Sequence, residues 1–439
     1  MKNVKPLILL TIPMLLFGCN ANNKTPEVKK GKVTVNMQGI VKGAKEEGYD
    51  ITVDFDMSYF DESAILFSDD IKMLSFAASI AAEGHKIDDF YKTMGFNNVY
   101  ASYPAPTEST VGFSFAHKKI KNADLVSVAI RGFDYGAEWA NNLSIGINGN
   151  HAGFDARANE VYAALKMYLD TYNYSDNPKL WITGYSRGGA IANVLASKLF
   201  TERNEIYVNE GECFVYTFES PRGLCEKYAI KYDNVFNIVN EYDIVTHIAP
   251  EEYGLYRCGT DVLINTDKNI DELIKTLDPN LELPVFTPFE NMWTNELEFV
   301  EYILNNLLEE TIPEEASITT REEFFTRYQE TIAYVINMYM TLPEATVNKI
   351  ADDFSQLGFL DIALILADED GIYNFLKPIF DEDEIPYVDS ELKAHCHTAE
   401  VLIVSQLGLL VYLMNDEVMA NATRMIYMHS PETIYVLIK

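Results

Sequence analysis

The chain is short of basic side chains. Lysine and arginine together number 34 against 66 aspartates and glutamates, which gives a formal net charge of −32 over 439 residues. Binding to nucleic-acid phosphates or to anionic lipid by charge alone needs clusters of basic residues, so this balance argues against both. Hydrophobic residues still make up 48% of the chain, enough for a packed core in one large domain or in a core domain with an insertion.

Long apolar runs are also missing, apart from a short one near the N-terminus. Two lysines precede an apolar run at 7–17, which is too short to span a bilayer as a stable helix and has the features of an export signal. The run ends in Leu-Phe-Gly before Cys19, which resembles a bacterial lipobox. We therefore expect a lipoprotein signal peptide at 1–18, a lipidated Cys19 and a flexible tether at 19–32. Ordinary signal-peptidase cleavage with an incidental cysteine is the alternative.

Cysteines are too few and too widely spaced for a zinc site. Besides the cysteine at the predicted lipidation site, the chain has Cys213, Cys225, Cys258 and Cys396, with no recurring close pair. Export permits disulfides among them, and buried thiols are the other interpretation. The acidic run at 381–384 lacks the ligand spacing of a calcium loop, which favours a solvated loop. No metal is predicted.

Apolar strands alternate with amphipathic helices over the first part of the chain, and no internal repeat is visible. This alternation predicts an α/β fold with a mostly parallel central sheet and helices on both faces. Strands are expected at 50–55, 111–115, 125–130, 180–183, 214–218 and 235–239, and helices at 67–83, 154–172 and 187–200.

The sequence pattern changes after residue 268. Residues 269–389 are strongly acidic and show amphipathic helices without obvious strands. We expect a core domain at 33–268, a helical insertion or cap at 269–389, and a return to the core at 390–439. The insertion could fold over an active site as a lid, although packing of its apolar faces on the core is the default.

A Gly-x-Ser-x-Gly motif carries the chemistry. It lies between the expected strand at 180–183 and the expected helix at 187–200, which is the strand–turn–helix context of a nucleophile elbow. Gly184 and Gly188 avoid clashes at that turn, and the helix N-terminus favours a developing anion near Ser186. The motif therefore predicts Ser186 as a nucleophile rather than as a capping serine.

An activated serine needs a histidine base and an acid that orients the histidine. In a sheet of this type the chain order is serine, acid, histidine. Asp243 follows the strand at 235–239, two strands after the one that carries Ser186, so both belong at the same edge of the sheet. Asp243 is the predicted acid, with Glu219 and Glu241 as alternatives.

Several spaced segments resemble the class 3 lipase family, the fungal-lipase-like α/β hydrolases. The resemblance runs from about residue 67 to 265 and implies an α/β-hydrolase fold, Asp243 as the acid and no cofactor. The matching segments, in chain order, are Leu-Val-Ser-Val-Ala-Ile-Arg-Gly at 125–132 with Trp139 after it, His-Ala-Gly-Phe at 151–154, Gly-Tyr-Ser-Arg-Gly-Gly at 184–189, Thr-Phe-Glu-Ser-Pro-Arg at 217–222 (Thr-Phe-Gly-Ser-Pro-Arg in the family) and Val-Asn-Glu-Tyr-Asp-Ile-Val at 239–245.

Chain order leaves three histidines as candidates for the base. Three others precede Ser186, among them His151, for which we expect a packing role at the start of the long helix; a fourth, His247, shares the loop of the acid. His395 and His397 are expected to open an apolar helix. His429 stands before a short terminal helix, where family members place their base. We predict His429, with His397 and His395 as alternatives.

Two backbone N–H groups should form the oxyanion hole. We expect them from Arg187, next after the nucleophile, and from Phe133, in the loop after the Arg-Gly strand. Many family members have threonine or serine after Arg-Gly, and Phe133 lacks that hydroxyl. With the neighbouring Tyr135 it could instead wall an acyl pocket.

The predicted function is that of a serine carboxylic ester hydrolase, a lipase or esterase acting on acylglycerol-like substrates through an acyl-enzyme. The expected partners are an ester or lipid substrate and the membrane, reached through a lipid anchor at Cys19, with no nucleic acid; the expected location is the bacterial cell envelope. A hydrolase of another acyl bond, such as a polysaccharide ester or an amide, and a non-catalytic surface lipoprotein are the alternatives. The sequence leaves the oligomeric state open.

Overall fold

The computed structural model describes most of the expected core domain and part of the expected insertion. The described residues are 29–83, 86–107, 110–121, 123–132, 149–174, 178–201, 206–247, 254–264, 269–287, 342–356, 365, 370–396, 399 and 416–439. The expectations for Cys19, His85, Phe133, Tyr135, Trp139 and His397 lie outside these residues.

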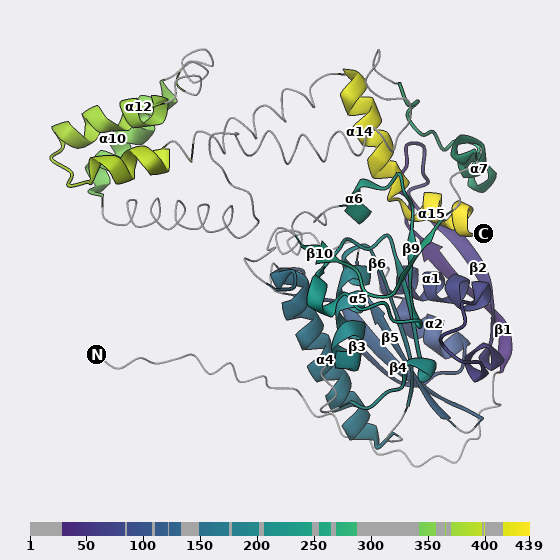
Figure 1. The fold of residues 1–439 in the computed structure, drawn as a ribbon. Coiled ribbons are helices and arrows are strands. Elements are labelled where there is room, and N and C mark those ends of the chain that lie inside the picture. Colours follow the sequence, from purple (N-terminus) through teal and green to yellow (C-terminus); the bar gives the residue numbers. More distant parts are fainter. Residues whose placement is uncertain are drawn as a thin grey trace.

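A seven-stranded sheet stands at the centre of the described fold (Figure 1), with the strand order β11-β9-β7-β6-β5-β4-β3. The five strands from β11 to β5 run parallel, and β4 and β3 extend the sheet antiparallel. The strands are β3 (Asn97–Ser102), β4 (Phe113–Ile120), β5 (Ala123–Ile130), β6 (Lys179–Tyr185), β7 (Cys213–Phe218), β9 (Val235–Val239) and β11 (Thr260–Leu263).

Helices cover both faces of this sheet, as the sequence predicts. Successive side chains of a strand point to opposite faces, so Trp181 and Ile182 enter different hydrophobic clusters. The cluster of Trp181 includes side chains of α1 and α2, and that of Ile182 includes side chains of α4 and α5. The four helices are α1 (Asp69–Glu83), α2 (Ile87–Thr93), α4 (Ala152–Tyr172) and α5 (Arg187–Thr201). The architecture is that of an α/β-hydrolase fold.

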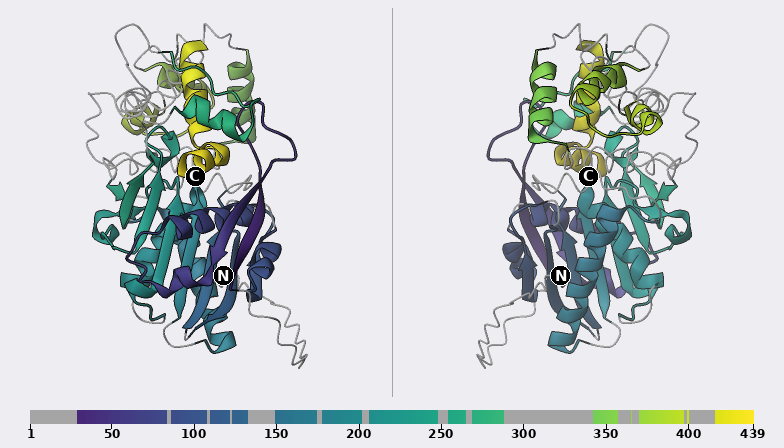
Figure 2. Two further views of the ribbon diagram at one scale, coloured as in Figure 1. Left: turned by 90° about the vertical axis from the view of Figure 1, so that its right-hand side faces the viewer. Right: turned by 90° about the vertical axis from the view of Figure 1, so that its left-hand side faces the viewer.

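Smaller elements complete the described core. β1 (Lys30–Met37) and β2 (Tyr49–Asp56) form a separate antiparallel pair that packs on α1, and β8 (Leu224–Cys225) pairs with β10 (Leu255–Tyr256). The C-terminal helices, drawn in yellow, lie beyond the edge of the sheet at which the parallel strands end (Figures 1 and 2). The remaining helices here are α6 (Ile244–His247), α7 (Ile270–Leu277), α14 (Asp416–Met428) and α15 (Pro431–Ile438).

The expected insertion divides into two parts with different packing. At its start, Ile270 and Ile274 of α7 belong to the same hydrophobic cluster as α1 and α15. These residues therefore pack with the core, although the acidic composition places them in the insertion. Further on, α10 (Glu344–Ser355) and α12 (Gly371–Glu382) pack against each other around a small cluster of their own, apart from the central sheet (Figure 1).

The cysteines answer a question that the sequence leaves open. Cys213, Cys225, Cys258 and Cys396 are all free thiols, and three of them are buried. Burial raises the pKa of the Cys213 and Cys258 thiols, so both behave as inert apolar side chains. Among the described helices, none combines the length and the apolar character that crossing a bilayer requires.

The aromatic core under α1 makes a prediction about stability. Phe214 of β7 is fully buried and meets Phe60 edge to face, with ring centroids 5.2 Å apart. We expect Phe214→Ala to lower the free energy of unfolding by about 3–5 kcal/mol, because it removes apolar contacts and leaves a cavity. Urea unfolding followed by circular dichroism measures this. Tyr207→Ala, at a side chain that is 58% exposed, is the control and should change little; equal losses would contradict the packing described.

Candidate active site

Ser186 occupies a tight turn between β6 and α5. Its backbone has a φ of 52°, a left-handed conformation that is uncommon for a residue with a side chain. Its N–H donates to the Phe218 carbonyl at 2.8 Å. A Cβ on Gly184 would lie 2.3 Å from the Gly188 carbonyl oxygen, so only glycine fits at the start of the turn. These are the features of a nucleophile elbow.

Three side chains from distant parts of the chain form a continuous row of hydrogen bonds. His429 Nε2 lies 2.8 Å from Ser186 Oγ, and His429 Nδ1 lies 2.5 Å from Asp243 Oδ2. All three residues are buried, and Asp243 is fully so. The structure thus brings together the predicted nucleophile, base and acid in the arrangement of a Ser–His–Asp triad.

His429 is held in place from its backbone as well as from its ring. The Tyr185 hydroxyl donates to the His429 carbonyl at 2.8 Å, and the Asn240 side chain donates to the Met428 carbonyl at 3.1 Å. Immediately afterwards Ser430 caps α15 by accepting the N–H of Thr433. Both β6 and the end of β9 therefore fix the loop between α14 and α15 that carries the histidine.

Asp243, rather than either glutamate alternative, bonds to the imidazole. Its other oxygen, Oδ1, accepts the N–H of Val245 at 2.8 Å, which orients the carboxylate. Glu219 lies beside it, and its carboxyl accepts the N–H of Asn240. Glu241 contributes its backbone carbonyl to His247 at 3.2 Å. Asp243 thus has a hydrogen-bond partner on each of its two carboxyl oxygens.

Three of the histidines that chain order excludes lie in the described part of the chain, and each has structural contacts. His151 caps α4 by accepting the N–H of Phe154 and stacks on that ring, as expected. His117 pairs with Asp124 at 2.8 Å within the β4–β5 hairpin. His247 bonds to a backbone carbonyl in its own loop. Of the alternatives for the base, His395 is half-buried beyond α12.

The oxyanion hole is described only in part. Arg187 is the first residue of α5, and the first backbone N–H groups of a helix project from its N-terminus. Its guanidinium turns to the Thr110 carbonyl, 2.9 Å away. Gly132 precedes Phe133, and its N–H donates to Glu83 Oε1 at 2.6 Å. A Cβ on Gly132 would lie 1.7 Å from the Tyr185 carbonyl oxygen, so this strand end passes directly against the elbow.

A second carboxyl group makes this site unusual in its charge. Glu219 is fully buried, and burial followed by the charge of Asp243 holds its pKa well above the usual range. Burial and the same two carboxyls raise the pKa of the Tyr185 hydroxyl. Glu219, Asp243 and His429 each offer a ligand atom within 4.8 Å of the others. A metal there would compete with Asp243 and Ser186 for the imidazole nitrogens, which their hydrogen bonds already occupy.

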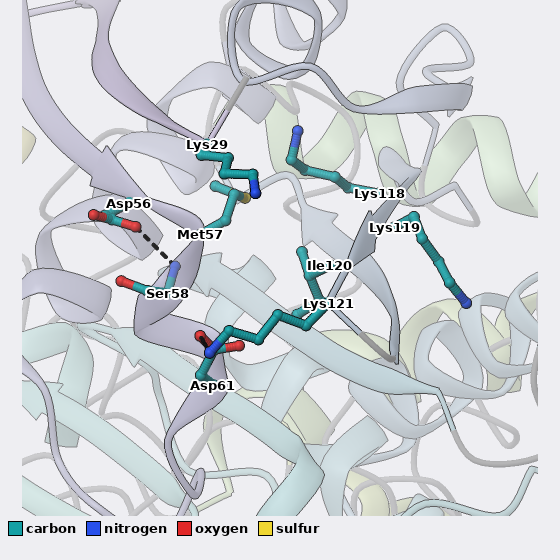
Figure 3. Close-up of a pocket in the computed structure, with 9 residues that line it drawn as sticks. All are labelled: Lys29, Asp56, Met57, Ser58, Asp61, Lys118, Lys119, Ile120 and Lys121. Carbon is teal, nitrogen blue, oxygen red and sulfur yellow. Dashed lines mark hydrogen bonds and ion pairs between the residues drawn. The ribbon is translucent and has the colours of Figure 1, made fainter. Parts of the chain in front are cut away.

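A pocket lies at the opposite ends of the strands from Ser186, near the turn between β4 and β5 (Figure 3). Several lysines line the pocket, and two of them bind neighbouring acceptors. Lys121 forms an ion pair with Asp61, and Lys118 donates a hydrogen bond to the Met94 carbonyl at 2.9 Å. This pocket is remote from Ser186, which stands where the parallel strands end. Its lining shows no nucleophile–base pair.

Comparison with known proteins agrees with the sequence resemblance. Residues 127–253 match the model of the family Lipase (class 3), a segment that includes Ser186 and Asp243 but ends before His429. A lipase from Rhizomucor miehei is 31% identical over 137 residues, which cover 30% of this chain and 37% of that protein. The chain thus spans little more than a third of the length of this curated relative. Less than a third of the chain lies in the matched family segment.

Solved lipase structures resemble the chain more weakly. A fungal lipase–inhibitor complex is 21% identical, covers 45% of this chain and 82% of its own, and has a TM-score of 0.37. The Rhizomucor miehei lipase–propeptide complex is 20% identical, covers 45% and 70%, and has a TM-score of 0.34. At this level the likeness carries no weight for activity.

The contact between Tyr185 and the His429 backbone makes a prediction. Tyr185→Phe removes the buried donor, so we expect a loss of about 1–3 kcal/mol in the free energy of unfolding and weaker positioning of the imidazole. Reaction of Ser186 with a fluorophosphonate should slow accordingly. Tyr91→Phe is the matched control, since its buried hydroxyl bonds to Ser127 at 3.0 Å, away from the triad. It should cost stability but leave the labelling rate unchanged; a Tyr185→Phe rate equal to the parent's would contradict the positioning role.

Proposed function

We propose that the protein is a serine hydrolase that cleaves carboxylic esters, with acylglycerol-like lipids as the favoured substrates, through an acyl-enzyme on Ser186. The observation that carries the proposal is the buried hydrogen-bond row from Ser186 through His429 to Asp243 at the end of a parallel strand. Capping serines and packing histidines account for none of this geometry, because both ring nitrogens are engaged in the order that general-base catalysis requires.

The mechanism follows from these contacts. His429 Nε2 takes the proton of Ser186 as Oγ attacks the ester carbonyl, and Asp243 stabilises the imidazolium that forms. The N–H of Arg187 donates to the oxyanion, with the N–H of Phe133 as the expected second donor. His429 then gives its proton to the leaving alcohol, and the acyl group remains on Ser186. Water, activated by the same histidine, releases the acid.

Lipid esters are favoured over other acyl bonds by the family match alone. The matched segment is that of class 3 lipases, and the similar Rhizomucor miehei protein is named a lipase. Polysaccharide esters and amides would use the same triad, so a substrate panel must separate them: p-nitrophenyl esters of increasing chain length, a triacylglycerol emulsion, an acetylated polysaccharide and an anilide. Hydrolysis of the last two alone would replace the lipase assignment while retaining the serine hydrolase.

A fluorophosphonate probe tests whether Ser186 is activated. The protein lacking residues 1–19 should be labelled stoichiometrically, and Ser186→Ala should abolish the labelling. Ser197→Ala is the matched control, because Ser197 lies on α5, is buried, and its hydroxyl donates to the Tyr228 carbonyl, away from the triad. An unlabelled parent, with and without detergent, would instead support a non-catalytic lipoprotein on a hydrolase fold.

The base assignment has its own test. We expect His429→Ala to lower kcat by about 10⁴-fold or more, because without the base the serine keeps its proton. His395→Ala is the control and should retain activity. Steady-state kinetics on a short-chain p-nitrophenyl ester measures both. Full activity of the His429 variant would show that another histidine is the base.

We also propose that the mature protein is a lipoprotein of the bacterial cell envelope, anchored through Cys19. The support is the basic start, the short apolar run and the Leu-Phe-Gly-Cys sequence at 16–19. An envelope location would place a lipid-active site near its substrate.

Metabolic labelling with an alkyne fatty acid in a bacterial host tests the anchor. The full chain should take up the label and fractionate with membranes, and Cys19→Ser should abolish both. Cys225→Ser is the control and should label like the parent, since the half-buried Cys225 lies in the folded core. A secreted, unlabelled parent would indicate ordinary signal cleavage.

A further inference from the structure

Glu219 adopts a left-handed backbone conformation that favours glycine. It follows β7 directly, in the segment Thr-Phe-Glu-Ser-Pro-Arg, and its φ is 48°. A glutamate in this left-handed conformation is uncommon, since its Cβ crowds the backbone where glycine would not. Backbone strain of this kind persists where surrounding contacts over-determine it, and it gathers at functional sites. The side chain is also fully buried.

The contacts of Glu219 lead to the acid of the triad. Its N–H donates to the Ile238 carbonyl at 3.0 Å, which aligns the turn with the end of β9. Both of its carboxyl oxygens share one donor, the N–H of Asn240, at 3.1 and 3.2 Å. Asn240 stands three residues before Asp243, and the carboxyls of Glu219 and Asp243 lie within 4.8 Å of each other. The two acids therefore meet inside the protein.

The donors around the two carboxyls decide which one keeps a proton. Asp243 accepts two N–H donors, one on each oxygen, whereas Glu219 shares a single donor between its oxygens. The cation facing Glu219 is Arg257, whose guanidinium is bound to Asp261 and to the carbonyls of Ser220 and Thr246. Among the described residues, the titratable groups around the pair include Tyr185, which keeps its proton, His429, and His247, whose imidazole interacts with the charge of Asp243. Two adjacent buried anions would be costly, so Glu219 is the one that stays protonated.

We propose that Glu219 is a positioning residue: its protonated carboxyl donates a hydrogen bond to the Asp243 carboxylate and so fixes the orientation of that acid toward His429. The proposal deepens the proposed serine hydrolase function and rests on it. The proton stays on Glu219 throughout, and Asp243 remains the single anion that balances the imidazolium. The triad thus becomes a row of four side chains, Ser186, His429, Asp243 and Glu219.

We expect the stability and kcat/KM of the parent to fall as the pH rises. Burial, then the neighbouring Asp243 charge, raises the pKa of Glu219 well above 4.5. A carboxyl whose pKa is higher in the folded protein contributes its full stability below pH 4.5 and loses it as pH rises toward the folded-state pKa. Above that pKa, ionised Glu219 no longer donates to Asp243 and repels it. The parent should therefore lose both stability and kcat/KM on the alkaline side.

Two variants separate the positioning role from a structural one. Glu219→Gln keeps a neutral N–H donor at nearly the same place, and Glu219→Gly removes the donor while suiting the left-handed backbone. At pH 7 we expect Glu219→Gln to keep kcat within about 2-fold of the parent, and Glu219→Gly to lower kcat about 10- to 100-fold, with little change in KM. Glu219→Gly relieves the left-handed backbone but also removes the acceptor of the buried Asn240 N–H, so the free energy of unfolding of both variants is measured by urea unfolding, and kcat is compared under conditions in which each is fully folded.

The pH profile of kcat/KM is the decisive readout. The parent should show an alkaline decline that Glu219→Gln lacks, while the acid limb stays the same in both. Glu219→Gly with parental kcat over the whole pH range would overturn the proposal. An equal loss of kcat in Glu219→Gln and Glu219→Gly would contradict the proposal that a neutral donor at this position orients Asp243. Loss of parent activity in EDTA, restored by Zn²⁺, would instead make the two carboxyls metal ligands.

A failure of the proposed function can be told apart from a failure of this inference. If the parent neither hydrolyses esters nor reacts with the fluorophosphonate, the hydrolase assignment fails. The Nδ1 proton of His429, seen by NMR at low field, still reports on Asp243. It should keep its shift in Glu219→Gln and move upfield or vanish in Glu219→Gly; an unchanged resonance in the glycine variant would show that Glu219 does not position Asp243.

Discussion

The hydrogen-bond row through His429 is the contact on which the functional geometry depends. It joins Ser186, at the end of a central strand, to a histidine 243 residues later and to Asp243 between them. Such distant segments meet only if the C-terminal helices pack over the carboxyl edge of the sheet. The same loop is therefore held by Tyr185 and Asn240, from two different strands. The imidazole has little freedom to leave the line between nucleophile and acid.

The N-terminal part of the chain supports this arrangement from the other side. Glu432, in the first turn of α15, accepts the N–H groups of Ile40 and Val41 at 2.6 and 2.7 Å. Those residues follow β1, which packs with β2 on α1. The helix that follows the catalytic loop is thus tied to the first strands of the core. These hydrogen bonds do not depend on the acidic composition of the intervening region, because they join backbone N–H donors to one buried carboxyl.

How far the sequence could predict the fold differs between central and edge elements. The strand at 235–239 and the start of α5 at Arg187 appear as expected, because their fully apolar or glycine-bounded patterns are distinctive. β11 and β3 were not predicted: they lie at the edges of the sheet, with short and partly exposed patterns that resemble loops. The expected strand at 111–115 is β4, which extends to Ile120 through two lysines. For the base, chain order left three histidines open, and only the packing of α15 brings one of them to Ser186.

Glu219 shows what local sequence reasoning can find and what it misses. As a carboxylic residue after a strand it was a rival for the acid, and that pattern cannot tell the acid from its neighbour. The sequence feature that sets Glu219 apart is its large side chain at a turn position that favours glycine. In the structure Ser186 and Glu219, at the ends of adjacent strands, both adopt left-handed backbone, with φ of 52° and 48°. The strain at Ser186 presents a nucleophile. The strain at Glu219 presents a carboxyl to Asp243, and a glycine there would avoid the strain but supply no donor.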